Sequence, residues 1–373
     1  MAALAFDRGA PHEQRNHGDR VDGQLDEQLD WRLGHRPARD GLRGIAVLCV
    51  LSLHFWPTRM VGGGVGVDLF FVLSGFLITR LLIEELHATG RINIRAFYIR
   101  RVRRLAPALL VVVAVCATAP GAIWTLLYGA NWVRASGGMR GPLEHTWSLS
   151  IEEQFYFVWP VLFIALARTR FARWYVGAAV TLIVVHRLDL HETTRSIARL
   201  TNGTDTRADA LLIGCLVAMT IAWLVRIRWN RIASVVACGL VAHVGGLVVL
   251  DITGVGFTII AIGCAVLLLA ALQCDRGPLT WTMLTKVGQL SYSLYLWHYP
   301  ITIWIRHGDV YNTSAASTTA AIVASLVAAL ASHRFIESPF RFAGRTLAHG
   351  TSAQERTTLQ SAVKRTLVSE AQR

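Results

Sequence analysis

The sequence has few cysteines, and none of them shows the spacing of metal ligands. Each of the six lies within or at the end of an apolar stretch, where a small buried side chain is expected. We therefore predict no disulfide framework and no metal site, and we expect no tightly bound cofactor. The six are Cys49, Cys116, Cys215, Cys238, Cys264 and Cys274.

The first forty residues lack the short apolar segment and small-residue cleavage site of a secretory signal peptide. Residues 1–38 are polar and mixed in charge, so we interpret them as a disordered tail. We expect the first apolar block to act as an uncleaved anchor. The chain has no internal repeat and no soluble catalytic domain, which assigns the chemistry to the apolar region 39–342. Residues 343–373 form a second polar tail.

Acidic side chains are also few, because the 373 residues include 24 Asp and Glu against 37 Lys and Arg, a formal net charge of +13. In a soluble protein this balance would suggest nucleic acid. Here the arginines cluster between apolar blocks, so membrane orientation and anionic lipid explain most of the charge. The chain is 53% hydrophobic with a mean hydropathy of +0.42, which is typical of a polytopic membrane protein. We expect membrane lipid, not nucleic acid, as a partner.

Most of the apolar blocks are near the roughly 20 residues that cross a bilayer. Arginine-rich connections alternate with longer, less basic ones, apart from Arg187, Arg195 and Arg199 on an expected outer loop. This alternation predicts an all-α bundle of about ten transmembrane helices with both termini in the cytoplasm. Pro107 is expected at a helix start. The predicted spans are residues 41–57, 66–86, 105–127, 147–167, 174–188, 207–225, 232–250, 256–273, 287–305 and 315–336.

The first predicted span has a cation near its start and an imidazole near its end. In a helix, Arg43 and His54 lie within about 20° of one face and are separated by a rise of roughly 16 Å. Ionisable groups in membrane helices are costly, so each is a candidate functional residue. A charged group and a base on one stripe of this helix organise the rest of the prediction.

The predicted topology brings acid, base and hydroxyl groups to one depth in the outer half of the membrane. His54 and Asp68 lie near the outer ends of their helices, and Ser148 and Glu152 share a helical face because they are four residues apart. We predict these four as the catalytic residues. Further residues are expected to line the acceptor site or a pore, namely Ser74, Arg207, Asp209, Tyr295 and His298.

Arginines gather on the predicted inner side, whereas the acid, base and hydroxyl candidates lie in the outer half. A compact ligand would not need binding groups that are divided between the two sides. A long anionic donor would, since guanidinium groups would hold its phosphates while its reactive end reached the outer base. A phosphopantetheine arm is comparable to the rise of the first helix, so acyl-CoA, with acetyl-CoA as the first choice, is the expected co-substrate. The residues predicted to bind it are Arg43, Arg100, Arg101 and Arg104.

Each candidate also has a purely structural interpretation. His54 would be a hydrogen-bonded interior histidine, and the arginine cluster would be an orientation signal. Ser148 and Glu152 would cap a helix, and Asp68 would be an N-terminal helix residue. His298 would be an interfacial residue. The common depth of the acid, base and hydroxyl candidates favours a functional role.

Six segments, in this order, resemble motifs of the membrane acyltransferase-3 family, which comprises inner-membrane O-acyltransferases of bacterial polysaccharides, glycolipids and some antibiotics. The resemblance covers about residues 39–342 and includes an arginine and a histidine separated by ten residues. It implies ten helices, acyl-CoA as donor, His54 as catalytic base and arginines as CoA contacts, in a short form without a C-terminal hydrolase-like domain. The segments are residues 39–54, 66–77, 97–107, 145–155, 291–298 and 337–341.

The residues and the resemblance together predict a multi-pass O-acyltransferase of the bacterial inner membrane. It would move an acyl group from cytoplasmic acyl-CoA to a hydroxyl of a carbohydrate-containing acceptor, a cell-envelope glycan or glycolipid. His54 would be the general base, Asp68 or Glu152 would orient it, and Ser148 would position the acceptor or stabilise the oxyanion. A covalent acyl-enzyme at Ser148 or His54 stays open.

Two other functions stay open at this point. In the first, the chain would catalyse the same acyl transfer, but the acceptor would be a macrolide-type metabolite. Alternatively, the chain would be a proton-coupled transporter of a glycolipid or an acidic substrate, with His54, Asp68 and Glu152 as a proton relay. Transporters often show two related halves with interrupted helices in matching positions, and the sequence shows no such symmetry.

Overall fold

The computed structural model describes residues 33–34, 36–244, 254–274 and 276–340. The tail predicted at 343–373 and nearly all of the one at 1–38 lie outside these residues. The secondary structure of the described residues is helical throughout. In chain order the elements are α2 (Pro37–Phe55), η1 (Val61–Gly64), α3 (Val65–Thr89), α4 (Ile94–Val115), α5 (Ala122–Leu126), α6 (Ala130–Ala135), η2 (Glu144–Thr146), α7 (Trp147–Ala167), α8 (Ala172–Thr194), α9 (Ile197–Asn202), α10 (Thr204–Leu224), α11 (Asn230–Val244), α12 (Gly256–Leu272), η3 (Pro278–Thr280), α13 (Thr282–Gln289), α14 (Ser291–Ile305), α15 (Ala315–Ser332) and η4 (His333–Glu337).

Four helical segments of the described residues are long and apolar enough to cross a membrane. Two shorter apolar helices, Asn230–Val244 and Gly256–Leu272, accompany them. The predicted all-α membrane bundle is therefore confirmed in its class. The four long segments are Val61–Thr89, Glu144–Ala167, Ile197–Leu224 and Ala315–Phe340.

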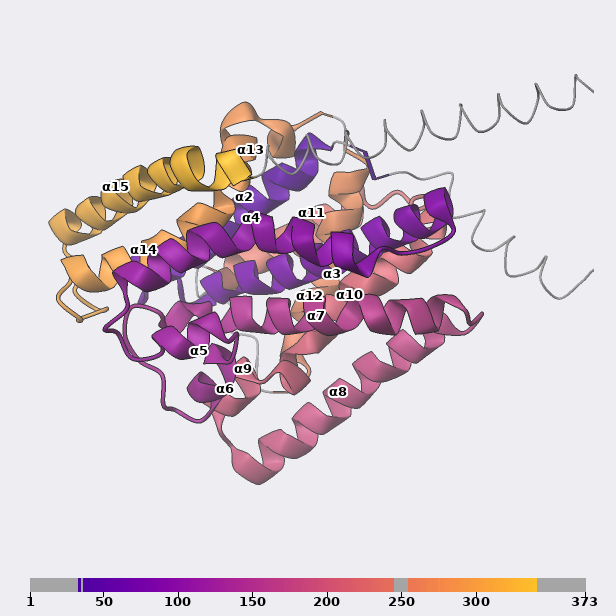
Figure 1. Ribbon diagram of the computed structural model, residues 1–373, viewed down its shortest axis with the longest axis horizontal. Coiled ribbons are helices and arrows are strands. Elements are labelled where there is room, and N and C mark those ends of the chain that lie inside the picture. The colour runs from indigo at the N-terminus through magenta and orange to yellow at the C-terminus, as the bar shows by residue number, and fades with distance from the viewer. Residues whose placement is uncertain (1–32, 35, 245–253, 275, 341–373) are drawn as a thin grey trace, which may run out of the picture.

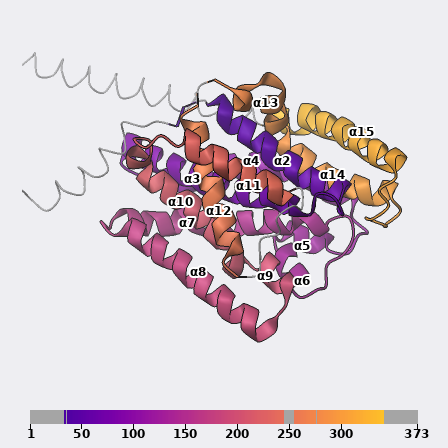
Figure 2. The same ribbon diagram turned by 180° about the vertical axis from the view of Figure 1, so that it is seen from behind.

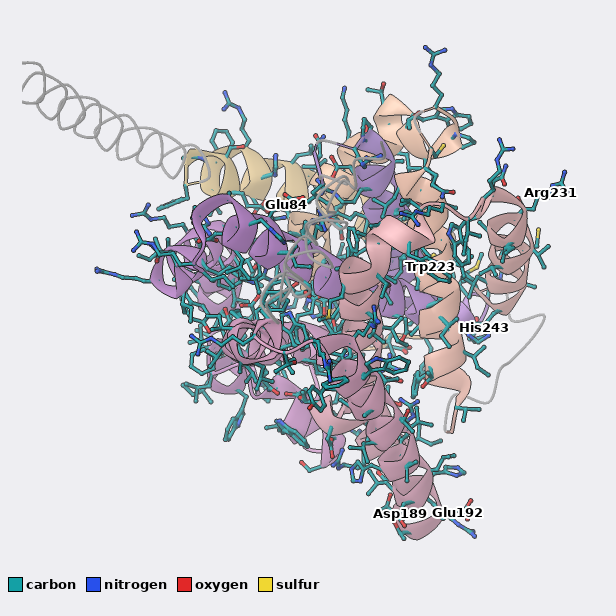
Figure 3. The ribbon with its side chains drawn as sticks, turned by 90° about the vertical axis from the view of Figure 1, so that its right-hand side faces the viewer. Glu84, Asp189, Glu192, Trp223, Arg231 and His243 are labelled. Carbon is teal, nitrogen blue, oxygen red and sulfur yellow. The ribbon has the colours of Figure 1, made fainter. Side chains whose placement is uncertain are left out.

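The helices form a bundle from which one member diverges. Figure 1 shows α3, α4 and α7 running across the middle of the molecule, with α13 and α15 on one side and α8 slanting away on the other. Figure 2 shows α11 and α12 on the opposite face. In Figure 3, Asp189 and Glu192 mark the end of α8 that lies farthest from the rest of the bundle.

Several predicted boundaries agree with the helices, and others are wrong, most clearly those of the third span. The predicted span 147–167 coincides with α7. The span predicted at 105–127 begins at Ile94 instead, because Asn93 caps α4 through a hydrogen bond from the backbone N–H of Ala96, 2.9 Å long. Pro107 consequently lies inside α4 and not at its start. The arginines that interrupt the apolar pattern are good helix formers, so polarity alone did not end this helix.

The helices α3 and α10 approach each other closely at two glycines. A Cβ atom on Gly75 would lie 1.9 Å from the carbonyl oxygen of Leu211, and one on Gly214 would lie 2.2 Å from that of Val72. Only glycine permits this approach, as small residues do in membrane helix pairs generally. The contact fixes α3, which carries Ser74 and Asp68, against the start of α10.

Candidate active site

A cavity of about 410 Å³ lies among α2, α3, α4, α7 and α14. It joins the cationic start of α2 and the arginine-rich part of α4 to the first turn of α7. Its lining residues at the cationic part include Arg39, Arg43, Arg101 and Arg104, and it also reaches Ser74, Ser148, Glu152 and Tyr295. One space therefore holds both the predicted donor-binding arginines and a predicted catalytic hydroxyl.

Two arginines of this cavity have hydrogen-bond donors that no described residue uses. Arg43 donates from Nη2 to Ser291 Oγ at 2.9 Å, while its buried Nε has no partner. Arg101 pairs with Glu153 at 3.1 Å and lies 3.0 Å from the ring centre of Tyr156, and its Nε is likewise buried without a partner. An unused buried donor costs about 1–3 kcal/mol. Such donors suit a ligand with negative charge.

The four predicted donor-binding arginines do not share one surface. Arg101 and Arg104 are three residues apart on α4 and line the cavity together with Arg43. Arg100 does not line it: its side chain is 58% exposed and pairs with Glu85 at 3.2 Å. At about 100° per residue, Arg104 lies between Arg100 and Arg101 around the helix, and Arg100 is on the side farther from Arg101, about 100° away.

The side chains of Ser148 and Glu152 form hydrogen bonds with residues of other helices. The interpretation of these two residues as helix caps is therefore wrong. The N-terminus of α7 has no side-chain cap. Ser74 donates to Glu152 Oε1 at 2.9 Å, and Ser148 Oγ lies 2.9 Å from the hydroxyl oxygen of Tyr295. That tyrosine donates to the backbone carbonyl of His145, which makes Ser148 the donor of the pair.

Two histidines meet beyond the cavity. His54 Nδ1 and His298 Nε2 are 3.0 Å apart, and His298 Nδ1 lies 3.0 Å from the carbonyl of Leu294 and 2.8 Å from that of Tyr295. Carbonyls only accept, so Nδ1 of His298 carries a proton and Nε2 of the neutral ring accepts. His54 therefore donates from Nδ1 and keeps a lone pair on Nε2. That lone pair is what a general base needs.

The cavity ends short of these histidines, which are not among its lining residues. The ring centre of Tyr295 lies 5.9 Å from that of His298, which lies 5.0 Å from that of His54. The hydrogen bond between Ser148 and Tyr295 thus stands between the cavity and the histidine pair.

Neither predicted orienting carboxylate contacts His54 among the described hydrogen bonds. Glu152 accepts from Ser74, and Asp68 accepts from Arg207 at 2.8 Å. The group that holds the imidazole is His298, which the sequence indicated only as a lining residue. Two histidines on separate helices leave no spacing signal, so their pairing was not predictable from the pattern.

Asp68 belongs to a second, closed cluster of charges between α3, α8, α10 and α12. Arg207 pairs with Asp68 at 2.8 Å, and Arg187 pairs with Asp209 at 3.0 Å, with all four side chains at most 4% exposed. The predicted outer-loop residue Arg187 is therefore a buried residue of α8. Arg207 and Asp209, predicted to line the acceptor site or a pore, do not line the cavity.

Arg306, which the sequence analysis did not single out, lies at the carboxyl end of α2. It donates to the backbone carbonyls of His54 at 3.1 Å and Phe55 at 2.7 Å, and to Thr318 Oγ1 at 3.1 Å. The last carbonyls of a helix have no intrahelical donor, so a buried guanidinium satisfies them. The sequence signal that could have identified Arg306 is its place as an arginine at the end of an apolar span. Within the described residues, no group of three or more His, Cys, Asp or Glu side chains is placed to hold a metal.

Apolar helices packed around a cavity that is lined by arginines define a class of helical membrane protein. Within that class, the family model described as "Acyltransferase domain" matches residues 37–334. The chain therefore belongs to the acyltransferase-3 family, as the six motifs predicted.

The relatives include two bacterial proteins named as O-acetyltransferases. The chain is 33% identical over 355 residues to O-acetyltransferase OatA of Staphylococcus aureus strain NCTC 8325 / PS 47, covering 83% of this chain and 57% of that protein. It is 32% identical over 351 residues to "Putative peptidoglycan O-acetyltransferase YrhL" of Bacillus subtilis strain 168, covering 83% and 55%. The chain thus spans just over half the length of these relatives. No solved structure matches it significantly.

Proposed function

We propose that the chain is the membrane-embedded acyl-transferring unit of an O-acyltransferase. The observation that carries the proposal is one cavity that joins buried arginines with unused donors to Ser148, whose hydrogen-bond partner Tyr295 also contacts His298 of the histidine pair through its backbone carbonyl. Family membership and the names of the relatives support the reaction class. A group transferred from a charged carrier to a hydroxyl suits this arrangement of cations and base.

The donor in this proposal is acyl-CoA, entering from the cytoplasm. Arg43, Arg101 and Arg104 bind its phosphates, because guanidinium forks match phosphate oxygens. The thioester end then reaches Ser148 at the far part of the cavity. The names of both relatives favour an acetyl group. Binding of the donor must separate Ser148 from Tyr295, since their contact closes the path to His54.

His54 acts as general base in the proposed reaction. Its Nε2 takes the proton of the acceptor hydroxyl while that oxygen forms a bond to the thioester carbon, and the carbonyl electron pair moves onto oxygen. When the carbonyl reforms, the carbon–sulfur bond breaks and the thiolate of CoA takes the proton from the imidazolium. Base catalysis of this kind contributes about 10²–10⁴-fold. Ser148, released from Tyr295, donates to the transient oxyanion.

His298 is the positioning residue of this base. Its Nδ1–H is held by two backbone carbonyls, so its Nε2 faces His54 with a lone pair. The contact selects the tautomer of His54 that has a free Nε2, and it shares the positive charge when His54 is protonated. A carboxylate performs this role in many hydrolases, whereas an imidazole performs it here.

The proposed acceptor is a hydroxyl of a cell-envelope glycan, reached from the outer side of a bacterial inner membrane. The name of the YrhL relative favours peptidoglycan among such glycans. About ten membrane passages with both termini in the cytoplasm would bring the arginines to the inner side and His54 to the outer half, as the positive-inside pattern predicts. The domain unit of the proposal is the predicted 39–342.

The proton-relay alternative has less support. It needs Asp68 and Glu152 within reach of His54, whereas Asp68 is paired with Arg207 and Glu152 accepts from Ser74. A macrolide-type acceptor would use the same chemistry and would be distinguished by the acceptor alone.

The test is transfer of radiolabelled acetyl groups from acetyl-CoA to muropeptides by the purified chain in lipid nanodiscs. His54→Ala should reduce transfer by at least about 100-fold without weakening acetyl-CoA binding. His186→Ala is the matched control, because His186 is an exposed histidine of α8 that contacts Asp205, away from the cavity. Near-normal transfer by His54→Ala would overturn the role of the base. Failure of the unaltered chain to bind acetyl-CoA would overturn the proposed function.

A further inference from the structure

A π-helical turn, η4, follows α15 and packs against α4 at the cavity. Turns of this type are rare and are found frequently at functional sites. The turn brings His333 into the lining of the cavity and buries Glu337 behind it, with side chains 25% and 5% exposed. The function described above assigns no task to either residue.

Glu337 is held from two directions. Its Oε1 accepts a hydrogen bond from Ser293 of α14, and its Oε2 lies 3.3 Å from Nδ1 of His333. An ionised carboxylate only accepts, so the proton between His333 and Glu337 belongs to Nδ1 of the histidine. This contact fixes the ring and leaves Nε2 as the nitrogen that is free to meet a ligand, as in carboxylate–histidine pairs generally.

The surroundings of His333 are cationic. Arg101 and Arg104 of α4 line the same cavity, together with Tyr292 of α14. The arginines of the cavity outnumber the two carboxylates that also line it, Asp40 and Glu152. Glu337 is not a lining residue, and it contacts the lining imidazole as a hydrogen-bond anchor.

We propose that His333 binds a phosphate group of the nucleotide part of the donor, with Glu337 as its positioning residue. The inference rests on the proposed function, because it concerns the donor of that reaction. A phosphate oxygen needs an N–H donor on Nε2, so His333 takes up one proton from solvent when the phosphate binds. The groups that face this imidazole are the Glu337 carboxylate, the Ser293 and Tyr292 hydroxyls and the Arg101 and Arg104 guanidinium groups.

The experiment compares CoA, 3′-dephospho-CoA and pantetheine as ligands of the purified chain in nanodiscs, by calorimetry. His333→Gln should weaken CoA binding about 5–10-fold, somewhat less than the usual contribution of a hydrogen bond to a charged group, because the site is partly exposed. Binding of pantetheine, which has no nucleotide, should not change. A loss that is confined to CoA and absent for 3′-dephospho-CoA would assign His333 to the 3′-phosphate, and equal losses for both would assign it to the pyrophosphate.

Two further readouts separate binding from a merely structural role. Glu337→Gln, which keeps His333 but removes the anionic anchor, should give an intermediate loss. If either variant does not fold, Ser293→Ala loosens the same carboxylate more gently. The Michaelis constant of His333→Gln for acetyl-CoA should rise, whereas its turnover number at saturating acetyl-CoA should equal that of the unaltered chain.

The possible failures are distinguishable. Unchanged CoA binding by His333→Gln, or an equal loss for CoA and pantetheine, would overturn the inference while leaving the proposed function intact. Absence of CoA binding by the unaltered chain, or full transfer by His54→Ala, would instead overturn the proposed function. His186→Gln should bind all three ligands normally and controls for the loss of a histidine elsewhere.

Discussion

Two clusters of buried charge lie in this bundle, and they differ in how each charge is compensated. In the closed cluster, Arg207 pairs with Asp68 at 2.8 Å and Arg187 pairs with Asp209 at 3.0 Å. In the open cluster around the cavity, Arg43 has no ion pair within the described part of the chain. Buried nitrogens without a hydrogen-bond partner occur in both clusters, on Arg43 and on Arg207, so the difference lies in the missing ion pair and in the cavity beside it. The closed cluster is neutral and joins four helices, whereas the open one holds positive charge next to an empty space. Burial alone therefore does not mark a functional charge, whereas incomplete compensation beside a cavity does.

The largest effect is expected from breaking the closed cluster. Asp68→Ala leaves the Arg207 guanidinium buried without its counter-charge, which costs about 3–5 kcal/mol. We expect a large fall in melting temperature and in the yield of monodisperse protein after extraction. The double variant Asp68→Leu with Arg207→Met should recover most of this stability, since it removes both charges. A stable Asp68→Ala protein would show that the cluster does not hold the helices together.

The next largest effect is expected in the open cluster, where a substitution should change the affinity for acetyl-CoA more than the stability of the protein. Arg101→Ala should raise the dissociation constant for acetyl-CoA about 10–100-fold, because a charge-assisted hydrogen bond is lost. Calorimetric titration measures the constant, and the melting temperature without ligand should fall less than for Asp68→Ala, because the lost pair of Arg101 with Glu153 is partly exposed. A loss of stability that equals the loss of affinity would remove the distinction between the two clusters.

The two clusters should also respond differently to salt, which tests the comparison without a mutation. Raising the sodium chloride concentration from about 50 to about 500 mM should weaken acetyl-CoA binding several-fold, because charges accessible to solvent are screened. The melting temperature of the ligand-free protein should change little, since the closed cluster is buried. The measurement is a pair of titrations and melting curves at both concentrations, and equal sensitivity of both quantities would contradict the comparison.

The smallest effect is expected for Arg100, which the sequence grouped with the donor-binding arginines. Arg100→Ala removes an exposed pair with Glu85, and such pairs contribute at most about 1 kcal/mol. The Michaelis constant for acetyl-CoA should change by less than about twofold. A loss comparable to that of Arg101→Ala would mean that the donor extends beyond the cavity onto the outer face of α4.

The apolar pattern predicted most helices correctly because burial in a membrane leaves a strong signal of composition and length. Residues 147–167 agree with α7, and 315–336 covers α15 and most of η4. The signal failed at α4, where the arginines within one continuous helix were interpreted as a polar connection between helices. It also failed at 287–305, which is divided at Leu290 between α13 and α14.

The candidate site was predictable to the extent that single residues carry chemistry. His54, Ser148 and Arg101 are unusual in apolar surroundings and were recognised for that reason. Their partners were not, since the contact of His54 with His298 and that of Asp68 with Arg207 join helices far apart in the sequence. Glu337 appeared in a motif, but its approach to His333 depends on a π turn, for which the sequence has no clear signature.

Arg306 connects His54, the proposed general base, to the segment that follows α14. The same guanidinium donates to the carbonyl of His54, to that of Val310 and to the hydroxyl of Thr318 on α15. The end of the first helix, the turn after α14 and the start of α15 are thus tied at one point. Because one side chain makes these contacts, a displacement of the turn after α14 would also displace the backbone carbonyls at the carboxyl end of α2, next to the imidazole that we propose as the base.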